Sequence, residues 1–327
     1  MMVQMKQIIK LIKKSNRVAV FAHQSADADC LGSQSAISFL CKQFGKKVDN
    51  YIDDDKIASY CKFIETNVNL GALFNPRDYD LLIAVDIATE RMLGQYKNDF
   101  KNHPNTIVID HHHERDLDAK YVYVDSTASS CGEIVYDILK LSKVEINKEI
   151  ATNLYSAIAG DTGCFLNDNT TVSAHTKAGE LIACGADFSM ANYNLFKFVS
   201  KKEFALRNLL NNMLVQSEGV SYCIIEEKLL EKGGYTFDDV GDYVNILMSL
   251  EGTKIAYLIK EKAKNTYSVS LRSLKGYDVS KIAQKFGGGG HIQAAGFYIG
   301  GKLKDFEKQL LFECQKEAKG EKFADVW

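Results

Sequence analysis

Carboxylate and imidazole side chains follow directly on short apolar runs in the N-terminal half of the sequence. Apolar runs of this kind are typical of buried strands, whose last residues emerge at the edge of a sheet where ligands bind in open α/β folds. The side chains are His23, Asp27, Asp29, Asp86, Asp110, His111, His112 and, after an apolar stretch further along, Asp161. Buried together, so many carboxylates need cations between them. The pattern predicts a metal site.

The donor types indicate which metals and which chemistry to expect. Carboxylate oxygens with one or two imidazoles, and no thiolate at the site, suit manganese, magnesium or cobalt better than zinc or copper. The number of acids favours two ions, because one ion would leave several carboxylates unneutralised. Two metal ions about 3.5–4 Å apart can clamp the attacking and leaving oxygens of a phosphoryl displacement and lower the pKa of a bridging water.

Two of these motifs allow more than one interpretation. In the spacing His23-x3-Asp27-x-Asp29, residues two apart in an extended loop point the same way, so Asp27 and Asp29 are expected to face one cavity and serve different cations. The alternative is that Asp29 caps the next helix. Asp110 is either a direct metal ligand or a partner that fixes the tautomer of His111.

A second cluster lies near the C-terminus, where the four glycines 287–290 precede His291. Four consecutive glycines are costly to order, so a purely structural turn is disfavoured. Backbone amides at a helix start would form an anion cradle, to which His291 adds a donor. Arg272, at the end of a predicted strand, could reach the same anion. A flexible turn and a surface arginine are the alternatives.

The elements that must position these groups follow from hydrophobic periodicity. Strands are predicted at 17–22, 47–52, 81–85, 106–109 and 121–124. They alternate with helical stretches, as in a parallel, doubly wound sheet. Helices are predicted at 7–14, 36–44, 131–141, 148–159 and 172–184. Four hydroxyl residues, Ser126, Thr127, Ser129 and Ser130, precede one of these helices, and we expect them to cap it rather than bind a ligand.

The pattern changes after residues 190–216, a mostly helical stretch without proline or glycine. Beyond it, strands are predicted at 219–225, 254–260 and 266–272. With 327 residues, two domains are expected. We predict an α/β fold in which a doubly wound, mainly parallel metal-binding domain (1–187) is joined by a helical connector (188–217) to a smaller α+β domain (218–327).

Composition restricts the partners and the compartment. The net charge is −2, with 40 basic and 42 acidic residues, which excludes a polycation that coats nucleic acid. Eight scattered cysteines without a CxxC pair indicate reduced thiols. Residues 1–14 lack the apolar core of a signal peptide, and no run is long enough to span a membrane. A cytoplasmic protein without a membrane partner is expected.

Taken together, the motifs resemble the DHH phosphoesterase superfamily. The resemblance rests on His23-x3-Asp27-x-Asp29-x2-Gly32-Ser33, Asp86, Asp110-His111-His112, Gly160-Asp161-Thr162-Gly163 and the glycine–His291 segment. It covers nearly the whole chain, and the last motif marks the DHH-associated C-terminal domain. Length and layout are most similar to the nano-RNase/pAp phosphatase (NrnA-type) group, although stand-alone cyclic dinucleotide phosphodiesterases share this layout.

Carried over position by position, the resemblance implies roles for these residues. One manganese would be held by His23, Asp27 and Asp86, and the other by Asp29, Asp86, His111 and Asp161. His112 would touch the scissile phosphate, so His112, Asp86 and Asp110 are the expected catalytic residues. The substrate's other phosphate or terminal nucleotide would be gripped by Arg272, Ser273, Gly289, Gly290 and His291. Where relatives often have Ser-Phe-Arg, this chain has 164–166 as Cys-Phe-Leu, which removes one basic substrate contact.

The resemblance implies a phosphoesterase with two divalent cations, Mn2+ ahead of Mg2+ or Co2+. It would release 5′-mononucleotides from RNA of a few residues and phosphate from 3′-phosphoadenosine 5′-phosphate (pAp). The near-neutral charge agrees with short RNA and small nucleotides rather than long duplexes, and a homodimer is compatible with the sequence. The alternatives are a phosphodiesterase for cyclic or linear dinucleotides (c-di-AMP, pApA), a non-catalytic nucleotide sensor, and an inorganic pyrophosphatase.

Overall fold

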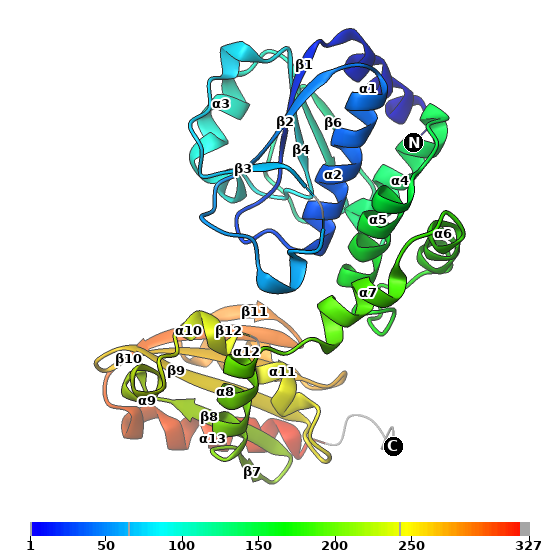
Figure 1. The fold of residues 1–327 in the computed structure, drawn as a ribbon. Coiled ribbons are helices and arrows are strands. Elements are labelled where there is room, and N and C mark those ends of the chain that lie inside the picture. Colours follow the sequence, from blue (N-terminus) through cyan, green and yellow to red (C-terminus); the bar gives the residue numbers. More distant parts are fainter. Residues whose placement is uncertain (1, 65, 242, 321–327) are drawn as a thin grey trace. The chain divides into compact units, whose positions relative to one another are not determined.

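The structure is a computed structural model that describes residues 2–64, 66–241 and 243–320. It divides into two compact units, Met1–Phe198 and Val199–Trp327, which are described separately (Figure 1). In the described residues, no helix combines the length and the apolar character that crossing a bilayer requires.

The first unit contains a parallel six-stranded sheet in the order β3-β2-β1-β4-β5-β6. Its strands are β1 (Arg17–Phe21), β2 (Lys47–Ile52), β3 (Val68–Leu70), β4 (Leu81–Val85), β5 (Thr106–Asp110) and β6 (Tyr121–Val124). Strands β4 and β5 are buried along their whole length, as expected for near-continuous apolar runs in a parallel sheet. After β3 the chain crosses to the other side of β1, so the strand order reverses between β1 and β4, where ligands bind in such sheets.

Helices cover both faces of this sheet (Figure 1). One face packs against α1 (Met2–Lys14), α2 (Ala28–Gln43), α4 (Cys131–Ser142) and α5 (Lys148–Asp161), with α6 (Val172–Ala183) outside them. The other face carries an aromatic cluster around Phe21, Tyr51 and Tyr96, together with η3 (Glu90–Tyr96) and α3 (Lys97–Asn102). Shorter elements are η1 (Ser59–Cys61), η2 (Pro76–Asp78), α7 (Phe188–Asn192) and η4, a π-helix (Tyr193–Lys197).

Helix α2 begins eight residues before the expected position 36, directly after Asp27. Most of its residues are buried, so it lacks the one-sided apolar stripe by which periodicity detects a helix. Gly32 explains how α5 packs so closely against it, because a Cβ atom at Gly32 would lie 2.4 Å from the carbonyl oxygen of Asn153. The two helices that bear Asp29 and Asp161 are therefore in direct backbone contact.

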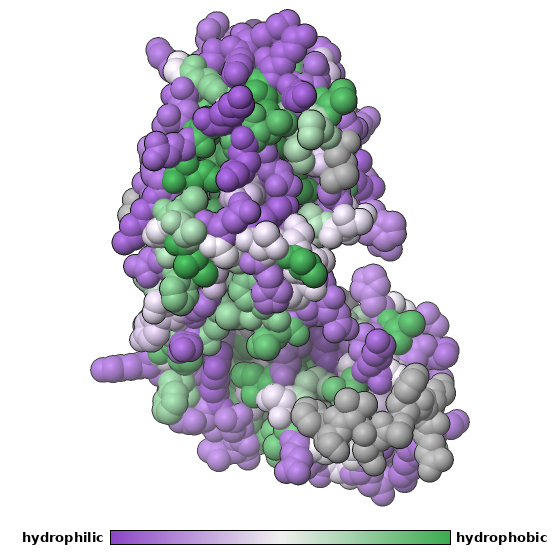
Figure 2. All heavy atoms as spheres, turned by 90° about the vertical axis from the view of Figure 1, so that its right-hand side faces the viewer, coloured by the Kyte–Doolittle hydropathy of each residue, from purple (hydrophilic) through white to green (hydrophobic). Residues whose placement is uncertain are grey.

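Figure 2 shows the side that lies at the right in Figure 1. Hydrophilic side chains cover much of this face, with hydrophobic ones scattered among them. The exposed large hydrophobic residues of the first unit include Leu166, which is 86% exposed. Scattered exposed apolar side chains are normal for a globular protein.

The second unit contains a mixed six-stranded sheet in the order β11-β12-β10-β9-β8-β7. The strands are β7 (Val215–Ser217), β8 (Val220–Ile225), β9 (Ile255–Ala263), β10 (Thr266–Ser273), β11 (Gly289–His291) and β12 (Ala294–Gly300). Only the β8–β9 pairing is parallel among them. The helices are α8 (Lys201–Asn211), α9 (Glu227–Gly233), α10 (Phe237–Val240), α11 (Tyr243–Met248), α12 (Val279–Lys285) and α13 (Leu303–Ala318).

The predicted fold class, a parallel α/β sheet followed by a smaller α+β part, is confirmed. The stretch 190–216 differs in detail from the expected helix. It is broken after the π-helix Tyr193–Lys197, resumes as α8, and ends in strand β7.

Candidate metal centre

The C-terminal ends of β1, β4 and β5 and the end of α5 bring the predicted acids and histidines together. Asp86 lies in the middle: its Oδ2 is 3.7 Å from Nε2 of His23, and its Oδ1 is 3.5 Å from Nε2 of His111. Asp161, the last residue of α5, has its Oδ2 3.1 Å from Nε2 of His111. Asp29 Oδ2 lies 3.7 Å from the same nitrogen. The two oxygens of Asp86 therefore face two separate groups of ligand atoms.

Asp86 is held in a conformation that only a defined environment maintains. Its φ of 57° lies in the left-handed region, and its backbone N–H donates to the carbonyl of Ile109 at 2.9 Å. Asp86 is 2% exposed, and its Oδ1 is buried with no hydrogen-bond partner among the described residues. An unpartnered buried carboxylate oxygen beside imidazole nitrogens is what a cation site requires, because isolated burial of the charge costs several kcal/mol.

His23 and His111 both present Nε2 to Asp86, whereas His112 faces it with Nδ1, 3.7 Å from Oδ1. The Nδ1 atom of His23 lies 2.7 Å from the carbonyl oxygen of Gln24, and Nδ1 of His111 lies 3.4 Å from that of Ala128. A ring N–H that donates to a carbonyl leaves the other nitrogen with a lone pair, which is the usual arrangement of metal-binding histidines. The donor set therefore fits divalent ions.

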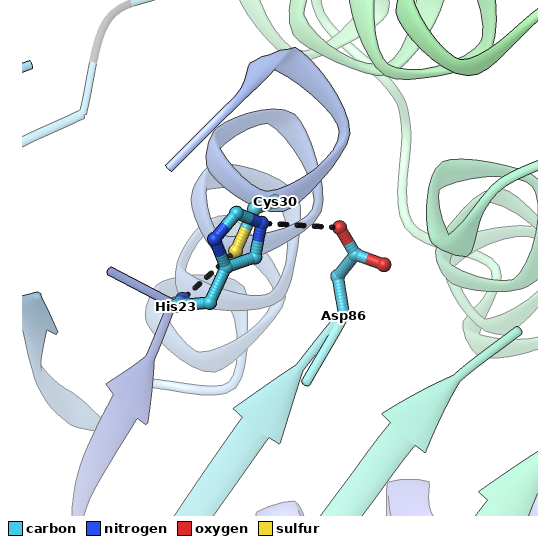
Figure 3. A group of neighbouring side chains, drawn as sticks. All are labelled: His23, Cys30 and Asp86. Carbon is cyan, nitrogen blue, oxygen red and sulfur yellow. Dashed lines mark hydrogen bonds and ion pairs between the residues drawn. The ribbon is translucent and has the colours of Figure 1, made fainter. Parts of the chain in front are cut away.

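Cys30, which the sequence analysis did not place at the site, lies beside His23 and Asp86 (Figure 3). Its Sγ accepts a hydrogen bond from the backbone N–H of His23 at 3.1 Å and lies 3.6 Å from the carbonyl oxygen of Val85. Burial raises the pKa of this thiol to about 12, so it is neutral near pH 7. Its contacts tie the ends of β1 and β4 together. Nothing in the sequence distinguishes Cys30 from the other buried cysteines.

Asp27 and Asp29 do not share an extended loop, and in this respect the prediction is wrong. Asp27 has extended backbone and caps α2, since its Oδ1 accepts the N–H of Cys30 at 3.0 Å. Asp29 lies in the first turn of α2 and is fully buried. Oδ1 of Asp27 lies 3.8 Å from Nε2 of His23, whereas Oδ2 of Asp29 lies 3.7 Å from Nε2 of His111. The two carboxylates therefore still face different groups of candidate ligands, as expected.

The carboxylate of Asp29 is bound by the start of another helix. Its oxygens accept the backbone N–H groups of Cys131 at 2.6 Å and Gly132 at 2.7 Å, the first two residues of α4, and Ser33 Oγ lies at 3.3 Å. The alternative prediction that Asp29 caps its own helix is therefore also wrong. Burial, together with the charges of Asp86 and Asp161, raises the pKa of Asp29 well above its usual range.

Asp110 orients His112 rather than His111, which corrects the predicted tautomer partner. Asp110 Oδ1 accepts Nδ1 of His112 at 2.8 Å and the backbone N–H groups of His111 and His112 at 2.8 and 3.2 Å. The hydrogen bond to Asp110 raises the pKa of His112 above its usual value. The Oδ2 atom of Asp110 is buried without a hydrogen-bond partner. His112 is half-exposed at the edge of the group.

The turn after Asp161 is tightly constrained. Gly163, Cys164 and Phe165 all have left-handed φ values, between 56° and 67°. Asn169 donates from Nδ2 to the carbonyl oxygens of both Asp161 and Ser129, each at 3.2 Å. Asp161 is thus fixed through its own backbone to the segment that precedes α4. Leu166, near the end of this turn, projects into solvent.

In the second unit, the predicted anion cradle at a helix start is wrong. The glycines follow the end of α12 and lead into the edge strand β11 (Gly289–His291). At two of these positions close packing explains the glycine. A Cβ atom at Gly288 would lie 2.2 Å from the carbonyl oxygen of Gly296, and one at Gly290 would lie 2.6 Å from that of Ala294. Gly289 has open space around it.

The remaining predicted substrate contacts lie near β11 in the same sheet. Ala294 of β12 pairs with Arg272 on one side and with His291 on the other, so these two residues flank it in register. The Nη1 atom of Arg272 bonds the carbonyl oxygen of Leu271 at 3.0 Å. Ser273 is buried, and its hydroxyl donates to the carbonyl of Tyr277 at 2.8 Å. Arg272 therefore lies on β10, two strands in from the edge strand β11 that carries Gly289, Gly290 and His291.

Comparison with known proteins agrees with both units. The family model "DHH family, N-terminal domain" matches residues 17–158, and the model "DHHA1 domain" matches residues 218–316. The chain is 27% identical over 298 residues to the probable bifunctional oligoribonuclease and PAP phosphatase NrnA of Streptococcus mutans, covering 90% of this chain and 93% of the relative.

A second relative and a solved structure extend this likeness. The bifunctional oligoribonuclease and PAP phosphatase NrnA of Mycoplasma genitalium is 28% identical over 316 residues, covering 95% of this chain and 96% of the relative. The crystal structure of an exopolyphosphatase-related protein from Bacteroides fragilis superimposes with a TM-score of 0.84 at 19% identity, covering 96% of each chain, and shows the same fold. The chain thus carries a match to a DHH N-terminal domain in its first unit and to a DHHA1 domain in its second.

Proposed function

We propose that this protein is a two-metal phosphoesterase that hydrolyses short oligoribonucleotides, including dinucleotides, to 5′-mononucleotides and removes phosphate from pAp. The observation that carries the proposal is Asp86, which is buried between His23 and His111 with one oxygen toward each and Oδ1 unpartnered. The oligoribonuclease and PAP phosphatase names of the two relatives support this choice of substrates.

The two groups around Asp86 would each hold one divalent ion. The first ion would be held by His23, Asp27 and Asp86, and the second by Asp29, Asp86, His111 and Asp161. Manganese suits this set of oxygen and imidazole donors, since the thiol of Cys30 beside it is neutral near pH 7. Bound ions would supply the Lewis acidity that activates water and offsets the charge of the phosphate.

The protein's own groups would bind and orient the substrate. His112, oriented by the contact of its Nδ1 with Asp110, would donate a hydrogen bond to a phosphate oxygen and stabilise the charge that develops there. In the second unit, the substrate's other phosphate or terminal nucleotide would be held by Arg272, Ser273, Gly289, Gly290 and His291. The open space around Gly289 supports this assignment, because no packing contact requires glycine there.

A substrate panel tests the proposal. Full-length protein with manganese chloride is incubated with a labelled diribonucleotide, pAp, a cyclic dinucleotide and pyrophosphate, and the products are separated by chromatography. Turnover of the diribonucleotide and pAp, absent in the Asp86→Asn variant, is the expected result. Inertness toward both, with hydrolysis of the cyclic dinucleotide or of pyrophosphate, would contradict it.

A further inference from the structure

The segment 128–132, just before and at the start of α4, is linked directly or through Asn169 to three of the proposed ligands. The Ala128 carbonyl oxygen faces Nδ1 of His111, and the Ser129 carbonyl is joined to the Asp161 carbonyl through Asn169. The N–H groups of Cys131 and Gly132 hold the carboxylate of Asp29. His23 and Asp27 are held by other parts of the chain, through the Gln24 carbonyl and Cys30. One short segment therefore supports one half of the centre.

This segment is fixed by a carboxylate that takes no part in the proposed chemistry. Glu133 is fully buried and accepts the backbone N–H of Ser129 at 2.9 Å and its hydroxyl at 2.6 Å. Ser173 of α6 donates its hydroxyl at 2.6 Å, and Lys177 Nζ lies 3.3 Å away. Although burial acts the other way, hydrogen bonds from Ser129 and Ser173 hold the pKa of Glu133 below its usual range.

The geometry resembles a capping box that is shifted by one residue. Ser130 caps α4 by accepting the N–H of Glu133 at 3.2 Å, while the Glu133 side chain reaches back to Ser129 instead of Ser130. The third backbone N–H of the helix, that of Glu133, therefore already has a partner in the Ser130 hydroxyl. The first two amides, with the positive end of the helix dipole, are left for Asp29.

We propose that Glu133 is a positioning residue for one metal ion of the pair, the ion held by Asp29, His111 and Asp161, and that it acts by fixing the segment 128–132. The inference rests on the proposed function, because it requires a two-ion centre. Partners that orient metal ligands typically contribute about 10-fold to 100-fold in metal affinity. Loss of the Glu133 carboxylate is therefore expected to weaken one ion selectively.

The test is a titration of the full-length, metal-free protein with manganese chloride, followed by calorimetry. In Glu133→Gln, the amide keeps the volume but has one oxygen, so if it accepts the two Ser129 donors, its NH2 group faces the donors of Ser173 and Lys177. One ion is expected to bind about 10-fold to 100-fold more weakly, with the other unchanged. Asp137→Asn is the matched control. Asp137 lies one turn further along α4 and also pairs with Lys177, at 2.8 Å, but its side chain is partly exposed to solvent. Both ions should bind it as they bind the wild type.

The outcomes separate this inference from the proposed function. Wild-type protein that binds two ions but hydrolyses neither substrate would refute the function alone. Glu133→Gln with two unchanged affinities, or with equal losses at both ions, would overturn the positioning role even if its thermal stability falls. Should Glu133→Gln fail to fold, Ser173→Ala removes a single hydrogen bond and must weaken the same ion, by a smaller factor; unchanged affinities there would equally overturn the proposal.

Discussion

Replacing Gly32 by alanine should separate the two helices that carry Asp29 and Asp161. Alanine in a helix interior normally stabilises by about 1 kcal/mol relative to glycine. At Gly32, however, the new Cβ atom would lie 2.4 Å from the Asn153 carbonyl oxygen and 3.1 Å from the Ala157 Cβ, and contacts under 3.0 Å essentially do not occur. Overpacking of this kind costs about 1–3 kcal/mol; after the gain of about 1 kcal/mol, we expect a net destabilisation of up to about 2 kcal/mol.

The matched control is Gly179→Ala in α6, also in a helix interior, where the added Cβ atom meets nothing within 4 Å. This variant should gain up to about 1 kcal/mol. Thermal unfolding followed by circular dichroism measures both, and the Gly32→Ala transition should lie up to about 8 °C below the wild type. Manganese should also bind Gly32→Ala more weakly, because α2 and α5 each carry a ligand. If Gly32→Ala is stabilised as Gly179→Ala is, the argument from helix contact is refuted.

Three further predictions concern the proposed centre. Asp86→Asn should lose manganese binding and detectable hydrolysis of a diribonucleotide, because both ions lose a charged ligand; retained binding of two ions would contradict the bridging role. Manganese affinity should rise with pH, since burial raises the pKa of Asp29 and contacts with acids raise that of His111 to about 11, so the metal must displace protons. Calorimetry at about pH 6 and pH 8 measures this, and a pH-independent affinity would be evidence against it. His291→Ala should raise KM with little change in kcat, whereas His112→Ala should lower kcat about 100-fold to 1000-fold; equal effects on kcat would argue against the division of roles.

The fold and the convergence of the ligands could be predicted because they depend on local patterns. Apolar runs at β1, β4 and β5 end in polar side chains, and parallel strands place those ends at one edge. His23, Asp86 and His111 followed from this rule alone. Helix α2 was located only in part, because burial on all sides removes the periodicity that such prediction needs.

The errors concern contacts between distant segments and choices among rotamers. Asp29 is bound by amides 102 and 103 residues away, which nothing next to it in the sequence indicates. Asp110 selects His112 over His111 through side-chain direction, which residue order does not determine. The glycines before His291 were assigned to a helix start because their role in close strand packing depends on β12, which follows them in the chain.

The left-handed backbone at Asp86 implies a trade-off between durability and activity. A non-glycine residue in this conformation costs about 1–2 kcal/mol, and an unpartnered buried oxygen adds to that burden. A glycine at this position would relieve both, so an inactive Asp86→Gly protein should tolerate heat better than the metal-free wild type. Selection for thermal robustness alone would thus erode the most central residue of the proposed centre.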